Sequence, residues 1–191
     1  MDELLADGGM IRKLWLGETA EYRDHLLRLD AESRRNRFGL AAPDEVIEAY
    51  MATSSWAGAV LHGFLVDGVV RAVAELKPFA APFPREGEVA FSVERPWQSH
   101  GVGSALLERT LLAARNRGIT RVHMACLADN ARMQQLARKF AAELSFDSGG
   151  VVGEVASPHP TPLSVLREIL ADNHGFTRAM LEAQSRLMKI A

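Results

Sequence analysis

The chain has 191 residues, of which 48% are hydrophobic and 24% are charged, and its formal net charge is −2. This length suits one domain with room for a helical extension, and the balance of residue types argues against intrinsic disorder. Because no basic stripe accompanies the near-neutral charge, we expect no nucleic-acid partner. Cys126 is the only cysteine, which excludes an internal disulfide and fits a reducing compartment. The acidic N-terminus and the absence of a long apolar run predict a cytoplasmic protein without membrane association.

The first half of the chain is predicted to form one strand, two helices and a pair of strands. Apolar residues indicate a strand over Met10–Leu16, a helix capped by Thr19, and a second helix opened by Pro43-Asp44. We interpret the segment between these helices as a loop that carries Phe38 and a cluster of arginines, read as a solvated helix end: Arg34, Arg35 and Arg37. Two β-rich runs follow, Ala57–Val66 and Val69–Leu76. The Asp67-Gly68 between them predicts a tight hairpin, since a type I′ turn needs positive φ at both positions.

The second half alternates strands and helices and ends in a helical tail. After a loop over Lys77–Glu86, the expected elements are a strand at Val89–Val93, a helix from Val102 to about Gly118, a strand at Arg121–Leu127, a helix from Asp129-Asn130 through Leu144, a strand at Val151–Val155, and two tail helices, Leu163–Asp172 and Phe176–Ile190. A meander that feeds a β-α-β crossover predicts an α/β (α+β) fold whose mixed, mostly antiparallel sheet is flanked by helices. We expect the domain to span residues 1–156 and a C-terminal helical extension to span residues 157–191. The apolar tail helices would pack on the domain or on a second subunit, which would make the protein a homodimer.

A glycine-rich turn joins the strand at Val89–Val93 to the helix that follows it. Pro96 ends the strand, and Gln98-Ser-His-Gly101-Val-Gly103 lies between the two elements. Its glycines allow the backbone to turn tightly and to approach another molecule, and the unpaired amides of the first helical turn favour an anion. The dinucleotide-binding and Walker A patterns are absent, because Leu106 stands where a third glycine would be needed and no Gly-Lys-Ser/Thr occurs. The turn therefore predicts a phosphate or diphosphate site.

Three features together resemble the GCN5-related N-acetyltransferase (GNAT) superfamily over most of the chain. They are Glu88, ten residues before Gln98; the Gln98-x-x-Gly101-x-Gly103 turn; and Asn130, followed by Met133, Leu136 and Lys139 on a helix. The resemblance implies the GNAT fold and acetyl-CoA as the cofactor. It implies that main-chain groups of Phe91, Ser92 and Val93 pair with the pantetheine arm and that Asn130 bonds near it. The amides that would hold the diphosphate are those of Gln98, Ser99, His100, Gly101, Val102, Gly103 and Ser104.

The same resemblance implies transfer of an acetyl group to an amine. An ammonium has no lone pair, so a base must take a proton before attack. Glu88 matches the glutamate that many members use, and Ser92 and Glu94, which alternate onto the same side of the strand, are secondary candidates, with Ser92 orienting a water. An amide near Phe91–Val93 would polarise the carbonyl. Many relatives place a tyrosine where this chain has Ala137, so the general acid is unassigned and water would serve, or the site would be catalytically weak.

Several alternatives remain open at this stage. The acceptor is a small metabolite, an antibiotic, a peptide terminus or a protein lysine, and two rival functions are a non-catalytic acyl-CoA sensor and a nucleotide-binding protein. A Cys126–His123 dyad is disfavoured, because residues three apart on a strand face opposite sides. The histidines show no spacing typical of metal ligands, so no metal is expected. Trp97 is expected to pack against the base of the following helix.

Overall fold

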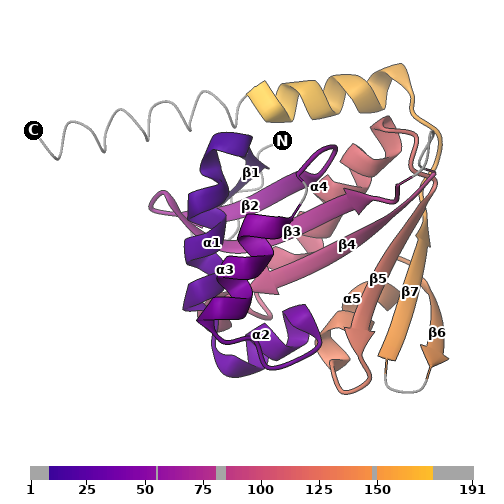
Figure 1. The fold of residues 1–191 in the computed structure, drawn as a ribbon. Coiled ribbons are helices and arrows are strands. Elements are labelled where there is room, and N and C mark those ends of the chain that lie inside the picture. Colours follow the sequence, from indigo (N-terminus) through magenta and orange to yellow (C-terminus); the bar gives the residue numbers. More distant parts are fainter. Residues whose placement is uncertain (1–8, 55, 81–84, 148–149, 174–191) are drawn as a thin grey trace, which may run out of the picture.

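A computed structural model describes residues 9–54, 56–80, 85–147 and 150–173 of the chain. A seven-stranded sheet has helices on both faces (Figure 1). The strands are β1 (Met10–Leu14), β2 (Val60–Val66), β3 (Val69–Pro78), β4 (Glu86–Val93), β5 (Arg121–Leu127), β6 (Glu143–Asp147) and β7 (Gly150–Ala156). The helices are α1 (Thr19–Arg28), α2 (Ala31–Phe38), α3 (Asp44–Thr53), α4 (Val102–Asn116) and α5 (Ala131–Lys139), with short 3₁₀ turns η1 (Leu16–Glu18) and η2 (Arg95–Trp97).

The strand order across the sheet is β1-β2-β3-β4-β5-β7-β6. Every neighbouring pair is antiparallel except β4 and β5, which run parallel on either side of the α4 crossover. The predicted mixed, mostly antiparallel sheet flanked by helices is therefore confirmed. The helices form two layers, with α1, α2 and α3 on one face and α4 and α5 on the other (Figure 1).

Each face of the sheet has its own hydrophobic core, because strand side chains alternate between the two faces. Leu76 and Val89 belong to the core under α4 and α5, whereas Val73 belongs to the core under α1 and α3. Trp97 packs on Phe64 in the first core, with ring centroids 5.6 Å apart. Trp97 thus has a packing role in this core, and its expected contact with the base of α4 stays a prediction.

The β2–β3 hairpin matches its local sequence signal. Asp67 and Gly68 have φ values of 51° and 73°, the left-handed region that a type I′ turn requires at both positions. The pairing begins at Val60 rather than Ala57 and extends β3 to Pro78. The strand expected over Met10–Leu16 ends at Leu14, because the chain then enters η1. The N-cap of α1 is Glu18 rather than the predicted Thr19, which is the first residue of the helix.

The predicted loop with the arginines is wrong, because this segment forms helix α2. Asp30 caps it by accepting a hydrogen bond from the Ser33 amide, and Gly39 ends it at φ 76°. The arginines are not uniformly solvated either. Arg37 is only 9% exposed and ion-pairs with Glu75 at 2.7 Å. Arg34 reaches back to backbone carbonyls, and Arg35 alone of the three is well exposed.

The helix expected through Leu144 is also wrong, because α5 ends at Lys139. Ala141 adopts φ 54°, which turns the chain out of the helix. The following residues form β6, a strand absent from the sequence prediction, in which Leu144 pairs with Gly153 of β7. Leu144 therefore packs against the core from a strand rather than from a helix.

The chain is helical over residues 162–173, close to the first predicted tail helix. Asp172 and Glu168 hold this helix by ion pairs to Arg109 at 3.1 Å and Arg117 at 2.6 Å. Its apolar face is exposed, with Leu163 57% accessible. The second predicted tail helix, Phe176–Ile190, lies outside the described residues. The domain boundary after residue 156, the cytoplasmic location and the homodimer stay predictions. Within the described ranges, no helix combines the length and apolarity needed to cross a membrane.

Candidate active site

Strands β4 and β5 are paired over only a short stretch. Their parallel register joins Glu86, Gly87 and Glu88 to Arg121, Val122 and His123 and goes no further. Beyond it, β4 continues to Val93 along β3, and β5 continues to Leu127 along β7. The edge of β4 that faces β5 is therefore free of this ladder from Val89 onward. An extended ligand can bind such an edge as an additional strand does.

The turn after β4 places the start of α4 at the mouth of this opening. Gly101 is the N-cap of α4 with φ 84°, and no side chain caps the helix. The first intrahelical bond runs from the Ala105 amide to the Gly101 carbonyl, so helix geometry leaves the preceding amides without intrahelical partners. A Cβ added at Gly103 would meet only Leu136 Cδ2, at 3.6 Å. The amides thus border open space at the positive end of the helix dipole.

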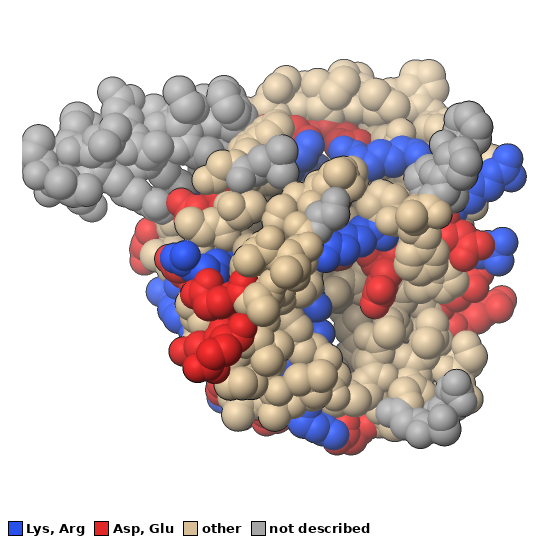
Figure 2. All heavy atoms as spheres, viewed as in Figure 1, with Lys and Arg blue, Asp and Glu red and all other residues tan. Residues whose placement is uncertain are grey.

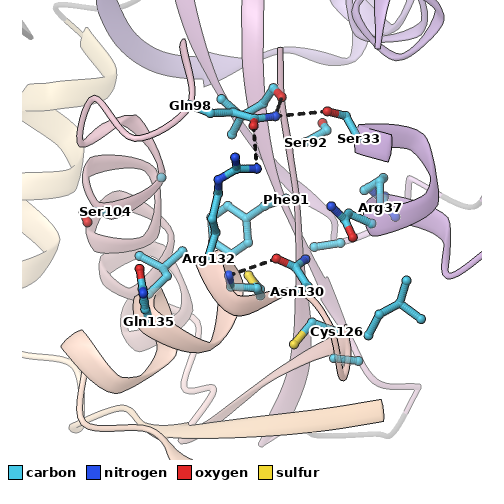
Figure 3. Close-up of a pocket in the computed structure, with 18 of the residues that line it drawn as sticks. Ser33, Arg37, Phe91, Ser92, Gln98, Ser104, Cys126, Asn130, Arg132 and Gln135 are labelled. Carbon is cyan, nitrogen blue, oxygen red and sulfur yellow. Dashed lines mark hydrogen bonds between the residues drawn. The ribbon is translucent and has the colours of Figure 1, made fainter. Parts of the chain in front are cut away.

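Gln98 ties three elements together at this point. Its Nε2 donates to the Val93 carbonyl at 2.9 Å and to Ser33 Oγ at 3.0 Å, and its Oε1 accepts from Arg132 at 2.9 Å (Figure 3). These bonds join the end of β4, α2 and α5. The side chain of Gln98 therefore shapes the turn. Its backbone amide donates to the Arg95 carbonyl at 3.2 Å, so the expectation that this amide holds the diphosphate is wrong.

A cavity of about 720 Å³ runs through the opening. Its walls come from α2, β4, the glycine turn, the start of α4, the end of β5 and α5. The surface is hollowed between the part over the α1–α3 helices and the part over β5 and β7, with acidic and basic side chains at the edge (Figure 2). Of the residues predicted from sequence, ten line the cavity: Glu88, Phe91, Ser92, Val93, Gln98, Ser99, Gly101, Gly103, Ser104 and Asn130. His100, Val102 and Glu94 do not line it.

The two candidate glutamates have different environments. Glu88 is exposed and lines the cavity, and its carboxylate forms no hydrogen bond or ion pair with any residue that the structure describes. Glu94 is buried and accepts from Arg28 Nε at 2.9 Å, Arg71 Nη1 at 3.1 Å and His25 Nδ1 at 3.2 Å. Burial alone would raise the pKa of Glu94, but hydrogen bonds from His25 and Arg28 hold this pKa below its ordinary value. Glu94 is therefore ionised and fully engaged, whereas Glu88 is available to a ligand.

Sequence reasoning missed His25, which lies behind the cavity. It comes from α1, is fully buried, and its Nε2 lies 2.9 Å from Ser92 Oγ. No local pattern in the sequence marks it, because its partners are 67 and 69 residues away. Burial lowers the pKa of His25, and the hydrogen bond to Glu94 partly offsets that effect.

The two tyrosines lie away from the cavity. Tyr22 and Tyr50 both donate to Glu75, at 2.6 Å from its Oε2, in a buried group that also contains Arg37 and Lys77. Only Arg37 of this group lines the cavity. Burial raises the pKa of Tyr22 well above its ordinary value, so neither position nor acidity suits it to protonate a leaving group in the cavity.

Cys126 lines the cavity, and no side chain among the described residues forms a hydrogen bond or ion pair with its thiol. Burial raises the pKa of its thiol, which keeps it protonated. His123 instead pairs with Glu86 at 3.0 Å and stacks on Phe79, and it does not line the cavity. Among the described residues, no group of three or more His, Cys, Asp or Glu side chains is arranged to hold a metal ion.

Comparisons with known proteins agree with this architecture. The family model described as the acetyltransferase (GNAT) family matches residues 11–142. Acetyltransferase Pat of Mycolicibacterium smegmatis is 30% identical over 113 residues, which cover 56% of this chain but only 34% of that relative. The matched part thus spans about a third of the length of this curated relative.

Solved structures share the fold. The GNAT domain of S. lividans PAT superposes with a TM-score of 0.70 at 24% identity, covering 82% of this chain and 96% of that one. The structure of yncA from Salmonella typhimurium with its cofactor acetyl-CoA gives a TM-score of 0.58 at 17% identity, covering 81% of this chain and 97% of that one.

Proposed function

The chain belongs to the acetyltransferase (GNAT) family, and from this premise we propose that it is an N-acetyltransferase. It moves an acetyl group from acetyl-CoA to a primary amine by direct attack, with Glu88 as the base. The observation that carries this proposal is the continuous cavity, which joins the amides of the α4 N-terminus to Glu88 through the opening between β4 and β5. A long, thin ligand with an anionic end and a reactive end fits such a channel.

The chain has the groups that coenzyme A needs. The amides around Gly101 and Gly103 face open space and receive the diphosphate, which the helix dipole stabilises. Lys139 and Arg132 line the cavity and donate to the side chains of Ser104 and Gln98, so they add positive charge beside the turn. The unpaired edge of β4 from Phe91 to Val93 accepts the amide-rich pantetheine arm as an extra strand, and Asn130 lies across the opening from it.

Acetyl-CoA supplies an acyl group on a thioester, whose sulfur leaves readily. An amide on β4 near Phe91–Val93 donates to the carbonyl oxygen and stabilises the negative charge that grows there. Glu88 accepts a proton from the incoming ammonium and so frees the nitrogen lone pair for attack. Glu88 suits this role because it faces the cavity and has no described partner that would compete for its carboxylate.

The acceptor is a primary amine of a small molecule, a peptide or a protein lysine. The half of the cavity near Glu88 is bordered by α2, including Asn36, Arg37 and Phe38. This wall mixes polar, cationic and aromatic side chains, so it offers contacts to an acceptor larger than the amine itself. The segment that was predicted to be a loop with arginines is thus a helix that lines this half of the cavity.

A non-catalytic acyl-CoA sensor is the second candidate, and one observation favours it. Ala137, where many relatives carry a tyrosine, is buried at 3% exposure, and neither tyrosine of the chain lines the cavity. A protein that only binds acyl-CoA needs the phosphate turn and the open edge of β4 but not Glu88.

Release of free thiol from acetyl-CoA, measured with a panel of primary amines, separates the two functions. For an enzyme, Glu88→Gln should lower the rate by roughly 10²- to 10⁴-fold while the affinity for acetyl-CoA is retained. Glu86→Gln is the matched control, because Glu86 lies on the same strand, pairs with His123 and does not line the cavity. Thiol release by Glu88→Gln at the native rate would refute the role of Glu88 as the base. If the native protein releases no thiol with any amine of the panel, the result favours the sensor.

A further inference from the structure

A buried chain of hydrogen bonds leads from the cavity wall into the protein through Ser92, His25 and Glu94. Ser92 Oγ lies 2.9 Å from His25 Nε2, and His25 Nδ1 lies 3.2 Å from Glu94 Oε1. The three residues are 4%, 0% and 7% exposed. Of the three, only Ser92 lines the cavity (Figure 3). This chain of hydrogen bonds therefore begins at the cavity and ends in the core.

The direction of each hydrogen bond follows from Glu94. Its ionised carboxylate only accepts hydrogen bonds, and it already receives Arg28 Nε and Arg71 Nη1. The proton of neutral His25 must therefore be on Nδ1, which donates to Glu94. The lone pair is then on Nε2, so Ser92 Oγ donates its proton to His25. This is the order of donors in a Ser-His-Asp triad, in which the carboxylate fixes the tautomer and the imidazole accepts the hydroxyl proton.

The charged and titratable groups around His25 are compatible with a proton acceptor. Glu94 contacts it from the end of β4, and Arg28 and Tyr22 flank it on α1. Burial lowers the pKa of His25, so the imidazole is neutral at pH 7 and its Nε2 is able to take a proton. Once protonated, the imidazolium would lie against the Glu94 carboxylate, which stabilises it.

Ser92 and Glu88 approach the cavity from the same side of β4. Residues two apart on a strand share a face, so Glu88, Ala90 and Ser92 all face the same half of the cavity, and all three line it. Ala90 has only a methyl side chain, which leaves room between the other two. An acceptor amine and a thioester that meet beside Ala90 would have Glu88 on one side and Ser92 on the other.

We propose that Ser92, His25 and Glu94 form a proton relay that carries the second proton of the acceptor nitrogen to the departing sulfur. The proposal rests on the proposed acetyltransferase function. Glu88 takes the first proton from the ammonium, and the nitrogen lone pair forms the C–N bond at the carbonyl carbon. The nitrogen then loses its second proton to Ser92 Oγ as the hydroxyl proton moves to His25 Nε2. When the C–S bond breaks, its electron pair leaves with sulfur, and His25 returns the proton through Ser92 to give the free thiol. Glu88 releases its proton to water.

The relay supplies the general acid that Ala137 leaves unassigned. A histidine that first accepts a proton and then donates it serves both halves of the reaction. Because the thiol of coenzyme A is itself a weak acid with a pKa near that of a free cysteine, about 8.5, protonation assists departure without being essential. The expected contribution is therefore at or below the low end of general acid–base effects, about tenfold to a hundredfold.

A second buried histidine–hydroxyl pair provides a matched control. His62 Nδ1 lies 3.1 Å from Thr110 Oγ1, and both residues are fully buried. Thr110 donates its own proton to the Leu106 carbonyl at 2.8 Å, so here the histidine donates to the hydroxyl. Neither residue lines the cavity. In this pair the histidine donates to the hydroxyl, which is the reverse of the hydrogen bond from Ser92 to His25, and neither residue can contact a ligand in the cavity.

The first test uses the free protein and needs no turnover. Nitrogen-15 NMR of histidine-labelled protein at pH 7 should show His25 as the neutral Nδ1–H tautomer, and Ser92→Ala should shift the Nε2 resonance of His25. An Nε2–H tautomer, or an imidazolium at pH 7, would overturn the relay, because neither can accept the Ser92 proton.

The second test measures turnover with an accepted amine. Ser92→Ala should lower kcat by about tenfold to a hundredfold and reduce the solvent deuterium isotope effect, with unchanged acetyl-CoA affinity, and Ser92→Thr should restore both. Thr110→Ala should leave kcat and the isotope effect at their native values. Native kcat and isotope effect in Ser92→Ala would refute the relay alone, whereas a native enzyme that transfers to no amine would refute the proposed function instead.

Discussion

Replacement of Gly103 by leucine should abolish cofactor binding without unfolding the protein. Gly103 lies in the first turn of α4, has ordinary helical geometry, and an added Cβ would touch only Leu136 at 3.6 Å. Long side chains on a helix point back toward its N-terminus. The leucine would therefore lie over the amides near Gly101 that are expected to hold the diphosphate.

The size of the effect follows from the hydrogen bonds that are lost. A hydrogen bond to a charged group contributes about 1.5–3 kcal/mol, so blocking two amides costs about 3–6 kcal/mol, or roughly 10²- to 10⁴-fold in affinity. Folding should not suffer, because leucine favours a helix by up to about 1 kcal/mol over glycine, which corresponds to a melting temperature raised by about 2–4 °C.

Thermal denaturation of the free protein, followed by calorimetric titration with acetyl-CoA, measures both quantities. Gly118→Ala is the control with the opposite pattern. Gly118 has φ 72° and open space around it, so the substitution should cost about 1–2 kcal/mol of stability through left-handed strain and leave acetyl-CoA affinity unchanged. Native affinity in a folded Gly103→Leu protein would refute the assignment of this turn to the diphosphate.

Two further predictions concern stability. Glu94→Gln removes the charge that Arg28, Arg71 and His25 share. Because both arginines are about one-third exposed, we expect the free energy of unfolding to fall by about 1–3 kcal/mol. A urea midpoint equal to that of the native protein would contradict this expectation. The pKa values of buried His25 and His62 are lowered by burial, so below pH 6.5 the unfolded chain binds protons that the folded chain does not. Stability should therefore fall from pH 7 to pH 5 by up to about 1.4 kcal/mol per pH unit for each histidine, and the slope should be smaller in His62→Gln. The lowered pKa of Glu94 acts only below about pH 4.5, outside this window, and unchanged urea midpoints between pH 7 and pH 5 would contradict the expected slope.

Features encoded in a few neighbouring residues were predictable from the sequence. Asp67-Gly68 specified the hairpin through its need for positive φ, and Gly101 marked the tight turn into α4, where its φ is 84°. The start of α5 was predicted because Asn130 accepts from the Met133 amide as an N-cap. In each case the physical cause lies within four residues of the chain.

Features that depend on tertiary packing were not predictable in the same way. Helix α2 has few apolar residues, and its position depends on the ion pair of Arg37 with Glu75 on β3. Strand alternation placed Glu88 and Glu94 on one side of β4. Only the placement of α1 shows that Glu94 is covered by His25 and Arg28 while Glu88 stays in the cavity. The distinction between the two carboxylates thus comes from contacts more than 65 residues apart in sequence.

A crystal structure of the protein with acetyl-CoA tests the central claim most directly. We expect the diphosphate on the amides of Gly101–Ser104, the pantetheine arm along β4 at Phe91–Val93, and the thioester in the half of the cavity that Glu88 faces. A cofactor bound elsewhere, or one whose thioester lies away from Glu88, would contradict it.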